Sequence, residues 1–389
     1  MEREKRNKEV KVTRRPRRKL GIKVELPPEP YVVSRDLVPL LERWARENGF
    51  ILPPAEFFDK LRREFTDYMK GMFPRFEFVH EDELAKGISE LVSKLASKLV
   101  SKKGLYPIIL SLDSVYYPTD PPLGITRLVD EKGEDRGYGR RPGTLPLLKQ
   151  FREIQKLKKE LEEKSSNEDN EDNEDNEDNE EFEVILVDDV IFTGKLLKRI
   201  AKRLSKMGFK VYIVAGIGIG KGVEELKEAG YEVYCVRIYE RVIDQVCERD
   251  FYPGVPFSGR TVVDREVGGR NVGAPYILPF GNPGKWASIP AKYWVRFSKF
   301  CIQQAIRLFE EIEKLSGRSV TCEALGRSVV TLPQDETRFV EALKKAEKSL
   351  RSFNFQHLGR LARRHRLDSL KRESASKNFR GGAAKRGVC

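Results

Sequence analysis

Cysteine is scarce in this chain of 389 residues, and its five cysteines are scattered. They show no CxxC spacing and their number is odd, which argues against both a zinc site and a disulfide framework. Long apolar runs are lacking as well, since no stretch reaches the ~18 residues that a membrane helix needs. The basic N-terminal residues are not followed by an apolar segment, so no secretory signal is expected. We therefore expect a soluble, cytoplasmic protein without a membrane partner.

Acidic residues are sparse at the two ends of the chain. Residues 1–24 contain 11 Lys and Arg against 3 Glu, and residues 351–389 contain 11 against 2 acids. Together these excesses are larger than the net charge of +13, so the body between them is net acidic. The basic arm 1–30 and the basic tail 353–389 either remain solvated or contact nucleic acid or another acidic partner.

Apolar residues are absent from an Asn-Glu-Asp repeat in the middle of the chain. The stretch Asn167–Glu181 carries ten acids in 15 residues. Such a segment cannot bury apolar surface, so residues 165–181 are predicted to form a disordered acidic insert. The spacing and the turn glycine of an EF-hand are missing, which argues against a calcium loop.

Helical periodicity dominates both flanks of the body. In the predicted extension 31–103, Ser34 is expected to cap a first helix, and further helices are predicted at 55–69 and 82–102. The predicted extension 266–352 carries helices at 294–315 and 336–350. Apolar residues of the 294–315 helix share one side: Phe297, Cys301, Ala305, Leu308 and Ile312.

Short apolar strands alternate with helices in residues 104–265. Strands are predicted at 107–112, 124–129, 184–187, 211–216 and 233–239. Helices are predicted at 145–164, 195–207 and 223–229, and residues 131–143 are predicted to form a loop. This alternation favours an α/β fold with a parallel sheet that helices cover on both faces.

The segment with the clearest chemistry is Val184–Gly194, which reads VILVDDVIFTG. Its four apolar residues predict a buried strand, and Asp188 and Asp189 follow at the carboxyl end, where ligands bind in open α/β sheets. Thr193 and Gly194 then lead into a helix, whose N-terminal N–H groups suit a phosphate. The carboxylates can accept hydrogen bonds from vicinal hydroxyls, so the whole string suits a sugar phosphate.

This string resembles the phosphoribosyl-pyrophosphate (PRPP) motif of type I phosphoribosyltransferases. The resemblance covers roughly residues 106–260 and implies that family's fold, with Mg²⁺ as the ion that neutralises pyrophosphate. It implies that Asp188 and Asp189 hold the ribose hydroxyls. The residues that it implies for the 5′-phosphate loop are Val190, Phe192, Thr193, Gly194, Lys195 and Leu196.

Two positions depart from the motif. Phe192 stands where relatives carry a small or acidic residue, so it cannot do the proton chemistry that an aspartate does there in hypoxanthine-type enzymes. Leu196 replaces a Thr or Ser and removes one hydroxyl from the phosphate site, a loss of ~1 kcal/mol for an ordinary hydrogen bond. PRPP binding is therefore expected to be weakened rather than abolished.

Other segments supply candidate partners for PRPP. Arg140 and Arg141, in the Gly-rich loop with Arg136, suit pyrophosphate oxygens, although solvated loop arginines would look the same. Asp113 and Asp250 are candidate metal ligands. Phe251, Tyr252 and Phe257 are candidate aromatics for stacking on a base, or else they rigidify a loop between domains. The glycines of residues 216–222 match neither a dinucleotide fingerprint nor a P-loop, and close packing is the favoured interpretation.

Three functions fit these patterns. The first is an enzyme that transfers a 5-phosphoribosyl group from PRPP to a base and releases pyrophosphate. The second is a non-catalytic regulator that senses PRPP or a nucleotide, which Phe192 favours because fold does not fix activity. The third is a domain of a defence or nucleic-acid-modification system that uses the basic termini. A homodimer is a further expected arrangement.

Overall fold

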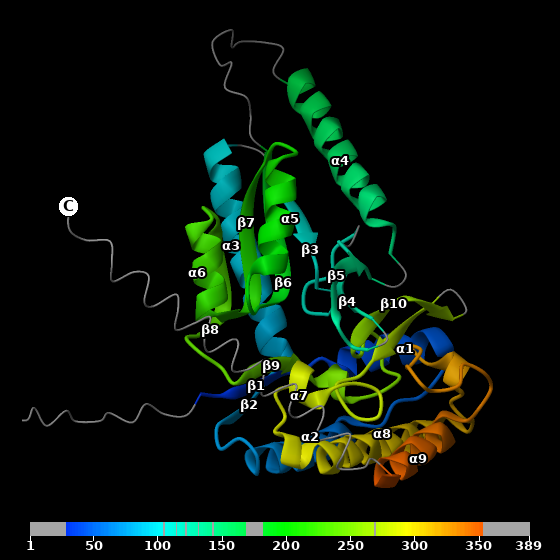
Figure 1. The fold of residues 1–389 in the computed structure, drawn as a ribbon. Coiled ribbons are helices and arrows are strands. Elements are labelled where there is room, and N and C mark those ends of the chain that lie inside the picture. The colour runs from blue at the N-terminus through cyan, green and yellow to red at the C-terminus, as the bar shows by residue number, and fades with distance from the viewer. Residues whose placement is uncertain are drawn as a thin grey trace, which may run out of the picture.

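The computed structural model gives the architecture of most of the body of the chain (Figure 1). The predictions for residues 1–28 of the basic arm, for residues 169–181 of the acidic insert and for the basic tail lie outside the described residues. Residues 165–168, predicted to be part of the disordered insert, are instead the last residues of the helix α4 (Leu147–Glu168). The structure describes residues 29–103, 106–113, 115–120, 123–130, 132–141, 144–168, 182–267 and 270–352.

Four parallel strands form the main sheet in the order β3-β6-β7-β8. The first three strands lie in register, with Leu186 of β6 opposite both Leu110 and Ile213. β6 and β7 are almost fully buried, as expected for central strands of a parallel sheet. The strands are β3 (Ile108–Ser111), β6 (Phe182–Ile191), β7 (Phe209–Ile219) and β8 (Glu232–Tyr239).

Helices cover both faces of the main sheet, as the sequence predicted. Successive residues of β6 point to opposite sides, so Ile185 packs with Ile88 of α3, whereas Leu186 packs with Ile200 of α5. Figure 1 shows α5 and α6 in front of the sheet and α4 projecting beyond it. The helices are α3 (Glu81–Lys103), α4 (Leu147–Glu168), α5 (Lys195–Ser205) and α6 (Gly220–Glu228).

A second sheet has the order β11-β10-β4-β5, and it corrects the prediction of a loop at 131–143. Residues 135–140 of that segment form β5, an edge strand that pairs antiparallel with β4, so that Gly139 lies opposite Thr126. The glycines concealed this strand, because glycine disfavours strands in general. The strands are β4 (Ile125–Val129), β5 (Asp135–Arg140), β10 (Arg260–Val267) and β11 (Arg270–Ala274).

A third sheet, β2-β1-β9, brings the chain's early residues against its later ones. The segment 31–103, predicted to be helical, therefore also contains two parallel strands, and Ser34 ends β1 rather than capping a helix. The predicted boundary at 103 also divides residues that pack together, because α3 lies on the main sheet. The strands are β1 (Tyr31–Ser34), β2 (Phe76–Val79) and β9 (Asp244–Cys247).

The remaining helices surround the largest hydrophobic core, which lies below the main sheet in Figure 1. The predicted apolar side of the 294–315 helix is confirmed, because all five of its residues are buried in α8. Among the described residues, no helix is long and apolar enough to cross a membrane. The α-helices are α1 (Leu37–Asn48), α2 (Ala55–Lys70), α7 (Pro283–Trp286), α8 (Trp294–Ser316) and α9 (Phe339–Ser349). The 3-10 helices are η1 (Glu248–Phe251), η2 (Ala291–Tyr293), η3 (Cys322–Ala324) and η4 (Leu350–Ser352).

Candidate functional site

The acidic pair lies at the carboxyl edge of the main sheet. β6 is buried through Val187, and Asp188 and Asp189 are half-buried immediately after it. The Asp188 Oδ1 accepts a hydrogen bond from the backbone N–H of Asp189 at 3.0 Å. Burial, the nearby Asp189 and Asp113 together raise the pKa of Asp188 well above its ordinary value. The predicted buried run Val184–Val187 is confirmed, but β6 continues to Ile191, so the pair lies within the strand near its carboxyl end rather than after it.

The turn after the pair depends on two glycines. Gly194 has a φ of +68°, and a Cβ there would lie 2.7 Å from the carbonyl oxygen of Gly222. A Cβ on Gly222 would in turn lie 2.6 Å from the carbonyl oxygen of Phe192. The starts of α5 and α6 can meet only because both positions lack side chains. This confirms the close-packing interpretation of the Gly216–Gly222 segment.

The residues predicted for the phosphate loop occupy this turn and the start of α5. Thr193 and Lys195 are exposed, whereas Phe192 and Val190 join the hydrophobic cluster on the α3 side of the main sheet and Leu196 joins the cluster on the other side. No side chain caps α5. Its first N–H groups therefore have no side-chain acceptor at the cap and, with the helix dipole, favour an anion at this position.

Arg249 is a site residue that the sequence did not reveal. It follows β9 and places its Nη2 4.0 Å from the Asp189 Oδ2, while the Cys247 thiol lies 3.7 Å from the same oxygen. Its guanidinium also pairs with the buried Asp36, whose Oδ1 accepts the backbone N–H of Arg249 at 2.9 Å. Burial raises the pKa of Asp36 to about 7, against the opposing effect of Arg249.

Two further arginines approach the acidic pair from the second sheet. Arg141 donates a hydrogen bond to the Leu112 carbonyl at 2.7 Å, and burial and Arg249 lower its pKa. Desolvation beside neighbouring groups acts to lower the pKa of Arg127, in β4, but nearby tyrosines and the acidic pair raise it overall. The prediction placed Arg141 here correctly but missed Arg127. Arg140 instead donates to the Thr144 carbonyl at 3.2 Å.

The two predicted metal ligands, Asp113 and Asp250, both accept hydrogen bonds from backbone N–H groups. Asp113 accepts hydrogen bonds from the N–H groups of Val115 at 3.1 Å, Tyr117 at 2.8 Å and Tyr116. Asp250 is buried and accepts the N–H of Gly259 at 2.8 Å. Within the described ranges, no group of three or more His, Cys, Asp or Glu could hold a metal ion. In this structure both carboxylates thus accept backbone hydrogen bonds, and their role as metal ligands stays a prediction.

The predicted base-stacking aromatics separate into two groups. Phe251 and Tyr252 are 0% and 2% exposed and belong to the large core, where Phe251 meets Phe297 edge-on at 5.2 Å. Their assignment to a base site is therefore wrong, and the alternative of a rigid loop is correct for both. Phe257 is only partly buried, and the Arg141 guanidinium lies 5.1 Å from its ring centre. It is the one of the three that lies beside the site.

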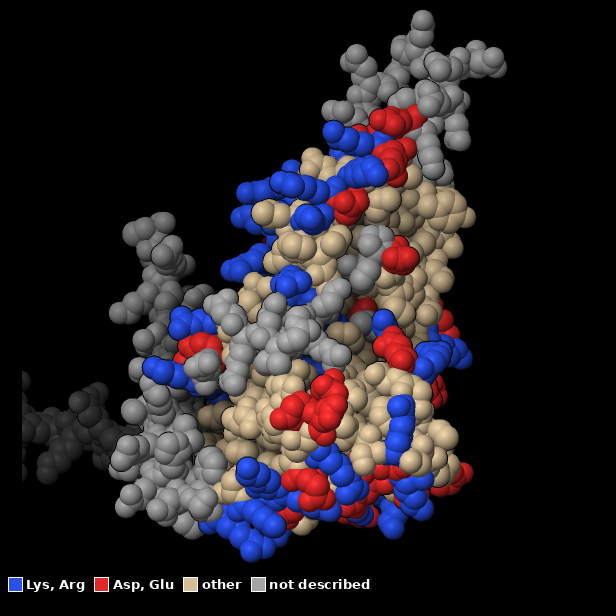
Figure 2. Space-filling view, turned by 90° about the vertical axis from the view of Figure 1, so that its right-hand side faces the viewer, with Lys and Arg blue, Asp and Glu red and all other residues tan. Residues whose placement is uncertain are grey.

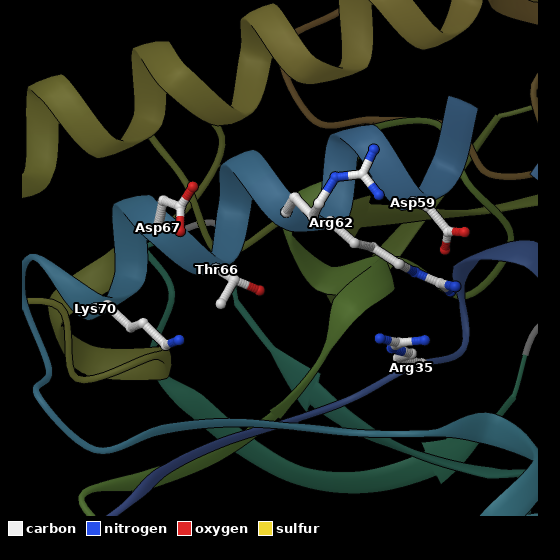
Figure 3. Close-up of a pocket in the computed structure, with 7 residues that line it drawn as sticks. Arg35, Asp59, Arg62, Thr66, Asp67 and Lys70 are labelled. Atoms are coloured by element: carbon white, nitrogen blue, oxygen red, sulfur yellow. The ribbon is translucent and has the colours of Figure 1, made fainter. Parts of the chain in front are cut away.

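A separate pocket of about 430 Å³ lies along α2 and contains none of the predicted residues (Figure 3). Arg62, which lines this pocket, forms salt bridges with the buried Glu248, where its Nη2 lies 2.9 Å from the Oε2, and with Glu81. Arg35 approaches it from the segment after β1, and its guanidinium lies 5.2 Å from the Phe78 ring centre. The lining residues are Arg35, Asp59, Arg62, Arg63, Thr66, Asp67 and Lys70.

Three parts of the chain that are far apart in the sequence thus meet at the sheet edge. β6 supplies the acidic pair, α5 supplies an uncapped N-terminus, and arginines come from the β4–β5 region and from the end of β9. The sequence comparisons add no precedent, since no protein-family model and no curated protein matches the chain. The arrangement places carboxylate acceptors and the N–H donors of a helix start within one short segment of the chain.

Proposed function

We propose that this chain binds PRPP at the carboxyl edge of the main sheet and transfers its 5-phosphoribosyl group, as a type I phosphoribosyltransferase does. The observation that carries the proposal is the continuity of β6, Asp188–Asp189, the Gly194 turn and the uncapped start of α5. These parts offer acceptors for two vicinal hydroxyls and N–H donors for a phosphate in one short segment.

The roles follow from the charges around the pair. Asp188 and Asp189 accept hydrogen bonds from the ribose hydroxyls, and the backbone of Thr193–Lys195 holds the 5′-phosphate. Arg141 and Arg127 stabilise the charge that develops on the leaving pyrophosphate. The acceptor nitrogen bonds to C1′ of the ribose, the C1′–O bond breaks with its electron pair leaving on pyrophosphate, and the acceptor's proton passes to solvent.

The Mg²⁺ ion implied by the resemblance has no set of protein ligands among the described residues. Mg²⁺ commonly binds through a few carboxylates together with phosphate oxygens of the substrate. We therefore assign the ion no protein ligand and derive no step through it.

A second candidate function is a sensor that binds PRPP or a nucleotide without turnover. Phe192 favours it, because this side chain packs with the sheet core and offers no polar group to a base. Binding of the ribose and phosphate would remain, since those roles belong to the carboxylates and to backbone N–H groups.

One experiment tests both functions. The full chain is titrated calorimetrically with PRPP and Mg²⁺, and pyrophosphate release is measured with a panel of bases. Release with one base supports transfer, and binding without release supports the sensor. The double variant Asp188→Asn/Asp189→Asn should lose binding, while Asp59→Asn/Asp67→Asn, which changes two exposed acids of the α2 pocket, should keep it. No binding by the unmodified protein would overturn both functions.

A further inference from the structure

One side of α5 is purely basic although the body of the chain is net acidic. Residues 195–206 contain six cations and no acid. All six are exposed, and within the part of the chain that the structure describes none of them forms a salt bridge with an acid. Figure 2 shows Lys and Arg gathered in the upper part of this view of the molecule. We call the six the α5 basic face: Lys195, Lys198, Arg199, Lys202, Arg203 and Lys206.

The spacing of these cations suits a chain of phosphates. At ~1.5 Å per residue, the α5 basic face extends over ~16 Å along the helix axis. One strand of a nucleic acid carries a phosphate every ~3.4 Å of its axis, so about five phosphates span the same length. Six cations along that length can neutralise such a run without bending the helix.

Aromatic contacts hold two of the guanidinium groups in place. The Arg203 guanidinium lies 4.0 Å from the ring centre of Phe151 in α4, and that of Arg199 lies 5.7 Å from the ring centre of Tyr138 in β5. Cation–π contacts of this kind restrict arginine side chains that would otherwise be mobile. Ordering before binding lowers the entropy cost of contacting an anion.

The packing of α5 narrows the class of partner. An amphipathic helix that inserts into a membrane surface buries its apolar face in the lipid, but the apolar face of α5 is already buried against the main sheet. A protein partner would need apolar or aromatic anchors at the centre of the contact. The α5 basic face offers repeated charge alone, which is the requirement for binding a phosphate backbone without base recognition.

We propose that the α5 basic face binds the phosphate backbone of a nucleic acid. This surface lies within the folded body and is distinct from the basic termini. The proposal does not depend on PRPP binding, since the variants tested below change side chains of α5 and leave the acidic pair and the backbone hydrogen bond from Lys198 to Gly194 in place.

The test compares two triple variants of the full chain. Lys198→Gln/Lys202→Gln/Lys206→Gln removes three charges from the α5 basic face. Lys86→Gln/Lys94→Gln/Lys98→Gln removes three exposed lysines from α3, which covers the opposite face of the main sheet. Circular dichroism checks that both remain folded. Fluorescence anisotropy measures binding of a labelled 20-nucleotide single-stranded DNA, the same RNA and a duplex DNA between 50 and 200 mM KCl.

The α5 variant should bind single strands about tenfold more weakly than the unmodified protein, and its log–log salt slope should be smaller by about 2, as expected for three lost phosphate contacts. The α3 variant should bind as the unmodified protein does. Equal binding by both variants would assign the affinity to other parts of the chain and overturn the proposal. Failure of the unmodified protein to bind any of the three probes, or binding only to vesicles of anionic lipid, would overturn it as well.

Discussion

Replacement of Arg249 by methionine tests the charge network behind the candidate site. Arg249 pairs with Asp36, a carboxylate whose side chain is 0% exposed, and the Arg249 side chain itself is only 14% exposed. Arg249→Met preserves an unbranched side chain but removes the charge. In the variant, residue 249 would still donate its backbone N–H to the Asp36 Oδ1, a hydrogen bond of 2.9 Å, but would no longer offer a positive charge.

The expected cost depends on pH. Removing one partner of a buried ion pair destabilises a protein by about 3–5 kcal/mol, and the retained backbone hydrogen bond favours the lower end, ~3 kcal/mol. Burial raises the Asp36 pKa from 3.8 to about 7 even beside Arg249, so the folded protein binds this proton more tightly than the unfolded chain does. Its contribution to stability therefore decreases as pH rises through this interval.

Without Arg249, the pKa of Asp36 rises further, and the carboxyl is neutral at pH 5. The cost of Arg249→Met there should fall to ~1 kcal/mol, the order of a lost hydrogen bond. Urea unfolding at pH 8 and pH 5, followed by tryptophan fluorescence, measures the difference. All three tryptophans, Trp44, Trp286 and Trp294, belong to the large core that adjoins this network.

Arg43→Met is the control, because Arg43 and Glu47 form an ion pair that is 63% and 58% exposed. Exposed pairs contribute little to stability, so this variant should stay close to the unmodified protein at both pH values. The reasoning is refuted if Arg249→Met costs the same at pH 5 as at pH 8, or if it costs less than about 1 kcal/mol at pH 8.

Two further variants address the acidic pair and its turn. Gly194→Ala should lower the free energy of unfolding and weaken PRPP binding, because the new Cβ would lie 2.7 Å from the Gly222 carbonyl oxygen. Gly230→Ala is the control, because Gly230 also has a positive φ, +91°, but has open space around it, so that only backbone strain is expected. Equal urea midpoints for the two variants would contradict this reasoning. Asp188→Asn should stabilise the fold at pH 8 by ~1 kcal/mol while weakening PRPP binding, because burial, Asp189 and Asp113 raise the Asp188 pKa and so disfavour its charge. The gain should vanish as the pH falls and Asp188 itself becomes protonated, and a less stable Asp188→Asn protein at pH 8 would exclude this explanation.

Local patterns in the sequence were sufficient to predict the main sheet. A run of apolar residues, an acidic pair and a glycine before a helix are all contained in residues 184–195, so β6 and the start of α5 followed from short-range rules. The same holds for α8, whose apolar side repeats every three or four residues. Strands of four residues, such as β1 and β2, carry too little periodicity to stand out beside helices.

Aromatic residues near a predicted site were misleading for a different reason. Phe251 and Tyr252 follow the last strand of the sequence pattern, where a ligand-contacting loop was expected. A loop whose aromatic residue stacks on a base and a loop whose aromatic residue fills a core can have the same amino-acid composition, with the same glycines and prolines beside the aromatic residue. Only the packing of α2 and α8 against this loop decides between them, and that packing is not contained in the loop's own sequence.

The residues missed at the site show why the acidic pair alone does not define a function. Arg249 and Asp36 are 213 positions apart, and they meet because β1 and β9 pair in register, with Ser34 opposite Cys247. Since Arg249 contacts both Asp36 and Asp189, the third sheet fixes the charge beside the pair, while the second sheet brings Arg141 and Arg127. The candidate site is therefore formed by residues from all three sheets, and the flanking segments are parts of it rather than additions to it.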